Sequence, residues 1–230
     1  MANNFKNAVR RNISADSGLP TEIYKAPDTK KSIAIEIDVS NKSSAGVTVT
    51  VQLEDESLNE TYSTTGTVTN QDAHAVTTVT GTNGLFTTTS NTNHNLIVND
   101  RIILTHSSGS MPSFTDASLP PSGETAVSTS RIYYVQSVST SAPYTFSIAE
   151  TKSGTKLTFD TSNTNLLFVK VHLADVVKDA PVPVGGALKV IAGQKLVLES
   201  LHANVNDKIY AYASSANACD VIASVLEDVS

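Results

Sequence analysis

The chain has 230 residues, of which 40% are hydrophobic, and its 16 basic and 22 acidic side chains give a net charge of −6. This length and hydrophobic content suffice for one large domain or two smaller ones with buried cores. An acidic balance without a basic stripe argues against direct nucleic-acid binding, because phosphates need a run of cations to neutralise them. No window approaches the roughly 18 consecutive apolar residues of a membrane span, and the start of the sequence lacks the apolar run of a signal peptide. We therefore expect a soluble protein, without a membrane partner, that is not secreted by that route.

Residues 1–20 predict an arm rather than a packed element. They contain the cations Lys6, Arg10 and Arg11 and a segment that forms at most two helical turns, which are marginal in water on their own. Two interpretations stay open, a tether to a neighbouring subunit and a frayed terminus. Arg10 and Arg11 are accordingly candidate partner contacts.

Two flanking segments, residues 21–66 and 166–230, carry the period-two alternation of half-buried strands. Residues 32–39 and 47–53 alternate most clearly, and the polar run between them predicts an antiparallel hairpin. The acidic trio Glu54-Asp55-Glu56 that follows is expected to be a solvated strand end rather than a calcium site, because consecutive acids point to alternating sides.

The later flank starts with residues 166–199, which we expect to form the middle of the sheet pair, with a Pro-Gly turn at 182–186. Further strands are predicted at 188–191, 195–198, 208–213 and 221–226. Together the flanks predict an all-β domain, a jelly-roll-like antiparallel β-sandwich of about eight strands written in two halves of the sequence.

Residues 67–165 differ in composition, being rich in Ser, Thr and Asn and poor in charge. They retain strand-like segments at 75–80, 84–89, 100–105, 132–138, 144–149 and 156–159. We therefore expect a second small β-barrel or sandwich inserted into the host domain. Its longest weakly patterned piece, residues 107–130, is a functional or mobile loop, and Met111, Phe114 and Leu119 are candidate partner contacts in it.

Side chains with catalytic or metal-binding chemistry do not form a recognisable pattern. The five histidines lack HxH and HExxH spacing, the single Cys219 has no disulfide partner, and the glycines match no phosphate-binding loop. We expect no catalytic residue, no metal and no cofactor. His172 alternates away from the apolar residues beside it, so it is a candidate contact that faces solvent or a partner.

A five-residue pattern occurs twice, as VNDRI at 98–102 and VNDKI at 205–209. Each copy precedes an apolar strand, and a tight Asn-Asp turn explains both. A reused hairpin turn is the interpretation we favour over a duplicated binding site.

The motifs of the two flanks follow one another in a characteristic order: YKAP at 24–27, DVSN at 38–41, VTVTVQL at 47–53, KDAPVPVGGAL at 178–188, QKLVLE at 194–199, NDKIYAYAS at 206–214 and DVIASVLE at 220–227. This order resembles that of sandwich-type virion proteins of tailed bacteriophages. Asn206-Asp207 stands where Gly-Asp is usual in that family.

The insertion has a resemblance of its own, carried by HNLIVNDRIIL at 94–104, LP at 119–120, RIYYV at 131–135 and YTFSI at 144–148. These segments resemble a β module found repeatedly in phage tail and fibre proteins. Asn95 and Asn99 replace the glycines of that module, and asparagine tolerates the left-handed conformation better than most residues.

The two resemblances imply a non-enzymatic structural protein of a tailed-phage virion, an accessory subunit of the neck or tail or a decoration of the capsid surface. They imply a homo-oligomer, with a trimer or hexamer favoured, that contacts other virion proteins and projects its inserted module outward. The expected location is the virion, assembled in the host cytoplasm.

Two other functions stay open. The first is an adhesin-like module of a tail fibre that binds a receptor or host cell-surface glycan through the loop at 107–130. Against it, the chain has no Trp and only 6% aromatic residues, whereas sugar sites usually rely on aromatic platforms. The second is a hydrolase with an unrecognised site, for which Asp100, His94 and His106 are the residues to test.

Overall fold

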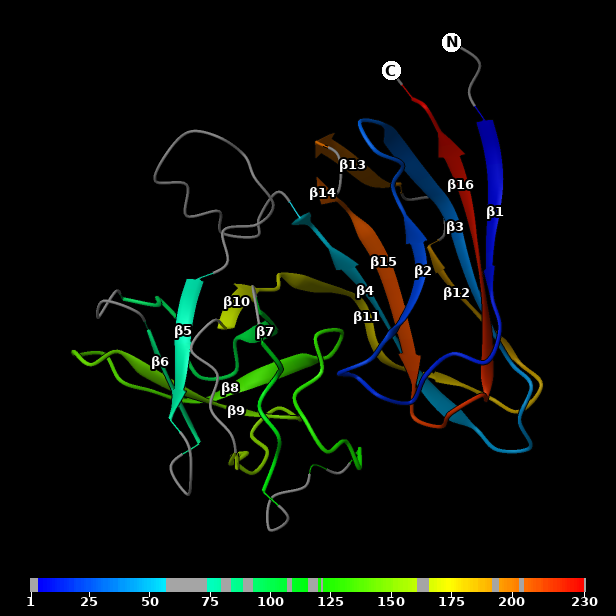
Figure 1. Cartoon of the computed structure of the whole chain (residues 1–230). Coiled ribbons are helices and arrows are strands. Elements are labelled where there is room, and N and C mark those ends of the chain that lie inside the picture. The colour runs from blue at the N-terminus through cyan, green and yellow to red at the C-terminus, as the bar shows by residue number, and fades with distance from the viewer. Residues whose placement is uncertain are drawn as a thin grey trace. The chain divides into compact units, whose positions relative to one another are not determined.

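The computed structural model describes residues 4–56, 74–79, 84–88, 93–106, 109–115, 120, 122–160, 166–191, 195–202 and 205–229. All regular elements in these ranges are β-strands, and the sheets are antiparallel (Figure 1). No helix of the described residues is long and apolar enough to cross a membrane. The predicted all-β class is therefore confirmed.

The chain divides into two compact units, a host unit of residues Met1–Asn59 and His172–Ser230 and an inserted unit of residues Glu60–Val171. The host unit contains two sheets. The larger, sheet A, has the order β1-β16-β3-β13-β14, with β12 also paired to β3. Its strands are β1 (Asn4–Arg10), β16 (Cys219–Glu227), β3 (Lys31–Asn41), β13 (Leu196–His202), β14 (Val205–Asn206) and β12 (Ala187–Ile191).

The smaller, sheet B, has the order β11-β4-β15-β2. Its strands are β11 (Leu173–Val182), β4 (Val47–Glu54), β15 (Lys208–Ala213) and β2 (Thr21–Lys25). Alternate side chains of both sheets meet in one apolar cluster, to which β3 contributes Ile37 and Val39 and β4 contributes Val49 and Val51. Burial of such faces stabilises the fold by roughly 25 cal/mol per Å² of apolar surface. The host unit is thus a sandwich of two sheets.

The predicted hairpin between residues 32–39 and 47–53 is wrong. β3 pairs with β16, β13 and β12 in sheet A, whereas β4 pairs with β11 and β15 in sheet B. The turn between them therefore crosses from one sheet to the other. Asn41 shapes this crossing, because its side-chain amide donates to the carbonyl oxygens of Ala45 (2.8 Å) and Val182 (3.1 Å). The period-two pattern fixes which face is buried, but it does not name the strand that pairs alongside.

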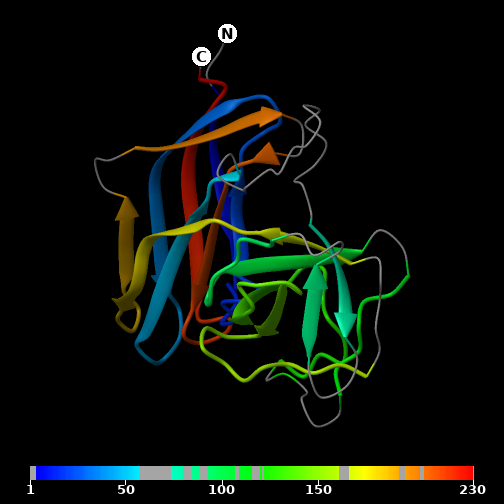
Figure 2. The same ribbon diagram turned by 90° about the vertical axis from the view of Figure 1, so that its left-hand side faces the viewer.

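The predicted N-terminal arm is also wrong for its described part. β1 pairs with β16 over seven residues, from Asn4 opposite Glu227 to Arg10 opposite Val221. Ile13 is fully buried in the host core. Figures 1 and 2 show β1 lying along β16. This segment forms a strand and not a helix, because the edge of sheet A provides hydrogen-bond partners for its backbone groups.

The inserted unit contains a ring of six paired strands. They are β5 (His74–Val79), β6 (Leu85–Thr88), β7 (Arg101–His106), β8 (Ile132–Val138), β9 (Thr145–Ala149) and β10 (Leu166–Lys170). The pairings run β10-β5-β6-β9-β8-β7, and β10 also pairs with β7. A cluster of phenylalanines fills its core, with ring centroids 5.1 Å apart for Phe86 and Phe146 and also for Phe146 and Phe168.

Two predicted segments change place in the inserted unit. Residues 166–170 were expected in the host sandwich, but β10 pairs only with β5 and β7 among the described strands. Phe168 belongs to the inserted core, so the aromatic packing decides the side of the boundary. The predicted strand at 156–159 is reduced to an isolated bridge between Phe159 and Phe114.

Candidate functional site

The candidate contacts of the host unit lie at its surface. Arg10 and Arg11 are exposed, and Arg10 donates from Nε to the carbonyl oxygen of Glu22 at 2.8 Å. His172 is half-buried and directly precedes β11. Arg10 contacts β2, whereas His172 adjoins β11 at the opposite edge of sheet B, so the arginines and the histidine do not form one site.

The candidate contacts of the inserted unit are less accessible than expected. Phe114 is only 3% exposed and packs in the core, and Met111 is half-buried against the same cluster. Leu119 lies outside the described residues. The side chain of Phe114 is therefore not available to a partner, and its apolar character served folding instead.

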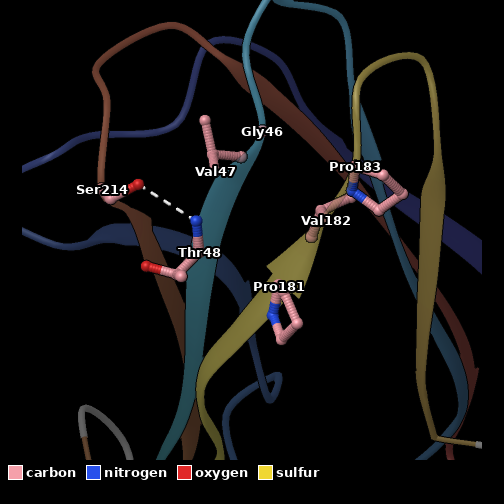
Figure 3. A pocket seen from close by; sticks show the side chains of 7 residues that line it. All are labelled: Gly46, Val47, Thr48, Pro181, Val182, Pro183 and Ser214. Atoms are coloured by element: carbon pink, nitrogen blue, oxygen red, sulfur yellow. Dashed lines mark hydrogen bonds between the residues drawn. The ribbon is translucent and has the colours of Figure 1, made fainter.

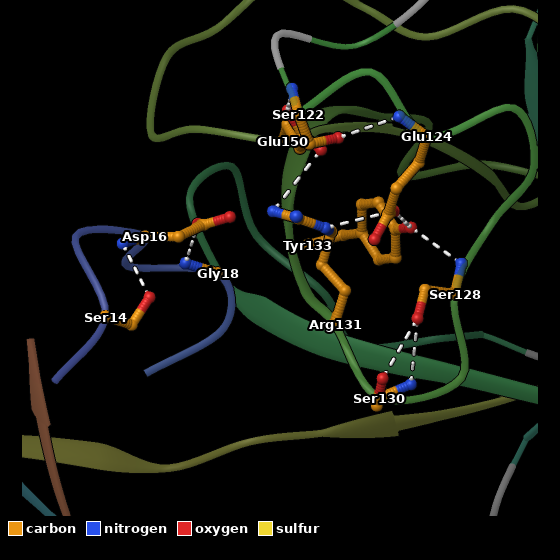
Figure 4. A network of polar contacts seen from close by, with 10 residues as sticks. All are labelled: Ser14, Asp16, Gly18, Ser122, Glu124, Ser128, Ser130, Arg131, Tyr133 and Glu150. Atoms are coloured by element: carbon orange, nitrogen blue, oxygen red, sulfur yellow. Dashed lines mark hydrogen bonds and ion pairs between the residues drawn. The ribbon is translucent and has the colours of Figure 1, made fainter. Parts of the chain in front are cut away.

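A buried arginine anchors the described part of the loop that precedes β8 (Figure 4). Arg131 is 2% exposed, and its Nε lies 3.1 Å from Glu124 while its Nη1 lies 3.3 Å from Glu150. Tyr133 accepts a hydrogen bond from the backbone N–H of Ser128 at 2.8 Å. Burial raises the pKa of the Tyr133 phenol, which keeps it protonated as a donor to Glu124. The network holds the loop in one place, and no pattern in the sequence predicts these ion pairs.

Two acids of the trio at the end of β4 are buried, so the predicted solvated strand end is wrong. Glu54 and Glu56 are each 4% exposed, and both carboxylates pair with Lys208 of β15. Lys208 lies directly opposite Glu54 in the strand register. Burial raises the pKa of Glu54, and the two carboxylates raise the pKa of Lys208 against the opposing effect of its own burial. The lysine is held protonated, which suits an ion pair and not a nucleophile.

Asp207 ties this cluster to the neighbouring backbone. Its two carboxylate oxygens accept hydrogen bonds from the N–H groups of Glu56 at 3.0 Å and Glu199 at 2.9 Å. Burial raises the pKa of Asp207 although both hydrogen bonds favour the carboxylate. Each charged group in the cluster thus has a structural partner, which leaves none directed at a substrate.

The histidines and the cysteine are dispersed. His94 is buried, and its ring Nε2 lies 3.2 Å from the carbonyl oxygen of Thr145, whereas His106 is exposed at the end of β7. Burial lowers the pKa of His94 and raises that of the Cys219 thiol, so both are neutral. Among the described residues, no group of three His, Cys, Asp or Glu side chains is arranged to hold a metal ion.

A hollow of about 440 Å³ lies at one end of the host sandwich (Figure 3). Its walls are apolar, with Val47 and Val182 paired across β4 and β11 and with Pro181 and Pro183 beside them. The one hydrogen bond drawn there joins the Thr48 N–H to the Ser214 hydroxyl at 3.0 Å and fixes the turn. It offers no charged group to orient a substrate.

The outer face of sheet A carries exposed apolar side chains among polar ones such as Glu36 and Lys189. One row runs across four strands through the register partners Phe5, Leu226, Ile33 and Val197. Phe5 is 60% exposed and Val197 is 49% exposed. Three further exposed apolar side chains lie on the same strands: Val9, Ile35 and Ile222.

No family model, curated protein or solved structure matches this chain.

Proposed function

We propose that the chain is a non-enzymatic structural subunit of a tailed-phage virion, an accessory subunit of the neck or tail or a decoration of the capsid surface. In this proposal the host unit is a jelly-roll-like sandwich that assembles with copies of itself and with other virion proteins. The inserted unit is a small barrel-like module that projects from the assembly. The resemblance of the sequence motifs, in the two flanks and in the insertion, to phage virion proteins supports the virion part of the proposal.

The observation that supports a subunit in an assembly is the apolar outer face of sheet A. Monomeric proteins rarely expose a contiguous apolar patch of more than a few hundred Å². On this face, Phe5 and Leu226 are register partners, as are Val9 and Ile222, so the apolar side chains occur in cross-strand pairs and are not scattered singly. Pairing of such faces about a symmetry axis would remove them from water in a closed trimer or hexamer.

The polar clusters support a structural role over an enzymatic one. The carboxylates around Lys208 and those around Arg131 are engaged within their own units. The glycan-binding alternative relied on the loop at 107–130, and the described part of that loop is packed through Phe114 and anchored through Glu124. No observation on the described residues of this loop favours that alternative.

Sedimentation velocity of the full chain tests the assembly. We expect a single oligomer of three or six copies that dissociates when Ile222→Asp places a carboxylate on the apolar face. Val184→Asp is the matched control, because Val184 is 58% exposed but lies in the turn after β11. A wild-type chain that remains monomeric at about 100 μM would contradict the assembly.

The virion part needs a separate test. Mass spectrometry of purified tailed-phage particles from the host that carries this gene should detect the chain at a fixed copy number per particle. Its presence only in the lysate, and never in the particle, would sink the virion role even if the oligomer exists.

A further inference from the structure

A groove of about 470 Å³ runs between the outermost strands of the two host sheets. It is lined by residues 6–10 of β1 and 22–25 of β2. Within the described residues, β1 pairs only with β16 and β2 pairs only with β15. Each strand is the last of its sheet, so each presents backbone groups that a further strand can pair with.

Arg10 marks one end of the groove and shows how its edges are satisfied there. Its guanidinium donates to the carbonyl oxygen of Val9 on β1 at 3.2 Å and to that of Glu22 on β2 at 2.8 Å. Because the Val9 carbonyl points toward this guanidinium, strand alternation directs the backbone groups of Asn7 and Phe5 to the same side. A side chain thus bridges the two edges at Arg10, and the rest of the groove lacks such a bridge in the described contacts.

The charge in the groove is opposite to that of the chain as a whole. Its lining carries the cations Lys6, Arg10 and Lys25 against the single carboxylate of Glu22, in a protein of net charge −6. Lys6 also pairs with Glu227 at 3.3 Å, but the lysine side chain is 54% exposed and the glutamate only 12%. An incoming segment therefore meets mainly cations.

The spacing of these cations matches a strand. Lys6, Ala8 and Arg10 alternate onto the side of β1 that faces the core, where Ala8 packs against the apolar cluster. Two cations thus stand four residues apart, about 13 Å along an extended chain, with a small residue between them. A paired strand with carboxylates at positions i and i+4 would bring each one beside a cation.

We propose that this groove binds an extended acidic peptide segment, which adds to the edge of β1 as a further strand and places carboxylates four residues apart against Lys6 and Arg10. Main-chain hydrogen bonds supply the affinity, and the carboxylate spacing supplies the selectivity. The inference does not depend on the virion role or on self-assembly, because one folded chain contains the whole groove.

Fluorescence anisotropy with labelled heptapeptides tests the proposal on the full chain. The probe is Thr-Glu-Val-Ser-Val-Glu-Thr, with its carboxylates at i and i+4. The matched control is its isomer Thr-Glu-Val-Ser-Glu-Val-Thr, in which an odd spacing sends the second carboxylate to the other face. We expect the probe to bind about threefold to fivefold more tightly than the isomer, because the isomer loses one of the two exposed ion pairs.

Variants of the protein locate the site. Arg10→Gln should weaken the probe about threefold or more and abolish the preference over the isomer. Lys178→Gln, an exposed lysine of β11 outside the groove, is the control and should bind as the wild type does. A probe N-methylated at its central Val-Ser-Val should lose binding, because methylation removes the donors that pair with β1.

Three results would overturn the proposal: no binding of the probe, equal binding of the two isomers, or tighter binding of a single-stranded oligonucleotide of equal charge. The last would assign the cations to a polyanion and not to a peptide strand. Circular dichroism of Arg10→Gln must match the wild type, and if it does not, the same peptides are compared on Lys6→Gln, which should also reduce the preference for the probe over the isomer.

Discussion

The same five-residue pattern occurs once in each unit and has two different structures. In the inserted unit Asn99 adopts a left-handed backbone with φ of 73°, and Asp100 accepts a hydrogen bond from the N–H of Ile97 at 2.9 Å. In the host unit Asn206 lies within the short strand β14, fully buried, and Asp207 accepts from backbone N–H groups far away in sequence. The predicted shared turn is therefore right for the first copy and wrong for the second.

The two copies differ in where their hydrogen-bond partners lie in the sequence. Asp100 satisfies a donor three residues before it, so the sequence around it is enough to specify the turn. Asn206 donates its side-chain amide to the carbonyl oxygen of Ala26 at 2.9 Å, to Asp28 at 2.7 Å and to Ser200 at 3.0 Å. These acceptors come from two other segments of the chain, so only the folded sandwich can hold Asn206 in place.

The largest expected effect comes from the basic residue near each copy. Lys208 forms ion pairs with two buried carboxylates, whereas Lys170, within the described residues, forms an ion pair with Asp100 alone, at 3.0 Å. Lys208→Met should destabilise the host unit by about 3 kcal/mol, since it leaves Glu54 and Glu56 buried without a cation. Lys170→Met should destabilise the inserted unit by about 1 kcal/mol, because its pair is single and partly solvated.

Urea denaturation followed by hydrogen-exchange mass spectrometry measures these changes, because it reports each unit through its own peptides. Lys178→Met is the control on the host surface and should change stability by less than about 0.5 kcal/mol. Equal effects at Lys208 and Lys170 would refute the claim that the number of buried carboxylates sets the cost.

The second prediction concerns the asparagines themselves. Asn206→Ala should destabilise the host unit by about 2 kcal/mol, because it removes the hydrogen bonds that a fully buried amide donates to Ala26, Asp28 and Ser200. Asn206→Asp should destabilise the host unit further, since it places a buried carboxylate beside the side chains of Asp28 and Ser200. Asn99→Ala in the inserted unit should cost only about 1 kcal/mol, the strain of a left-handed alanine.

Thermal or urea unfolding of the three variants provides the measurement. If Asn206→Asp were as stable as the wild type, the three hydrogen bonds of the Asn206 amide would not be the reason for its burial.

These two copies also show how far sequence reasoning reached. The left-handed turns at Asn95 and Asn99 were predicted and are confirmed, with φ of 51° and 73°. Their chemistry is local, as is the alternation that correctly placed the strands at 32–39 and 208–213. The ion cluster at Glu54 was missed, because a run of acids looks solvated until β15 places Lys208 opposite it. Arg131 was missed for the same reason, since its carboxylates lie 7 and 19 residues away in sequence.

The third prediction uses pH to separate the host copy from its counterpart. Burial holds the folded-state pKa of Glu54 and of Asp207 above the usual values for these groups. An acid whose pKa is raised by folding takes up protons when the chain folds. The contribution of these two groups to the stability of the host unit is therefore fully present below the usual carboxyl pKa of about 4 and is lost as the pH rises through their folded-state values.

The midpoints of urea denaturation of the host unit, measured from about pH 4.5 to about pH 8, give the slope of its stability against pH. This range lies above the unfolded-state pKa values of the carboxyl groups. Each titrating proton contributes at most about 1.4 kcal/mol per pH unit. Glu54→Gln should flatten this slope, whereas the control Glu36→Gln, on the outer face of sheet A beside Lys189, should leave it unchanged. An unaltered slope in Glu54→Gln would show that Asp207 or another group carries the dependence.

The smallest expected effect is that of a glycine at the asparagine of the first copy, whereas the same substitution in the second copy should be costly. Glycine adopts a left-handed backbone without strain, so Asn99→Gly should keep the inserted unit within about 0.5 kcal/mol of the wild type. Asn206→Gly removes the amide and loosens a strand, so it should destabilise the host unit by about 2 to 3 kcal/mol. Each of the two motifs that these segments resemble has Gly at this position, and we expect the structure to accommodate that glycine only at position 99. Matched urea curves of the two variants test this, and a stable Asn206→Gly would restore the common turn that the sequence suggested.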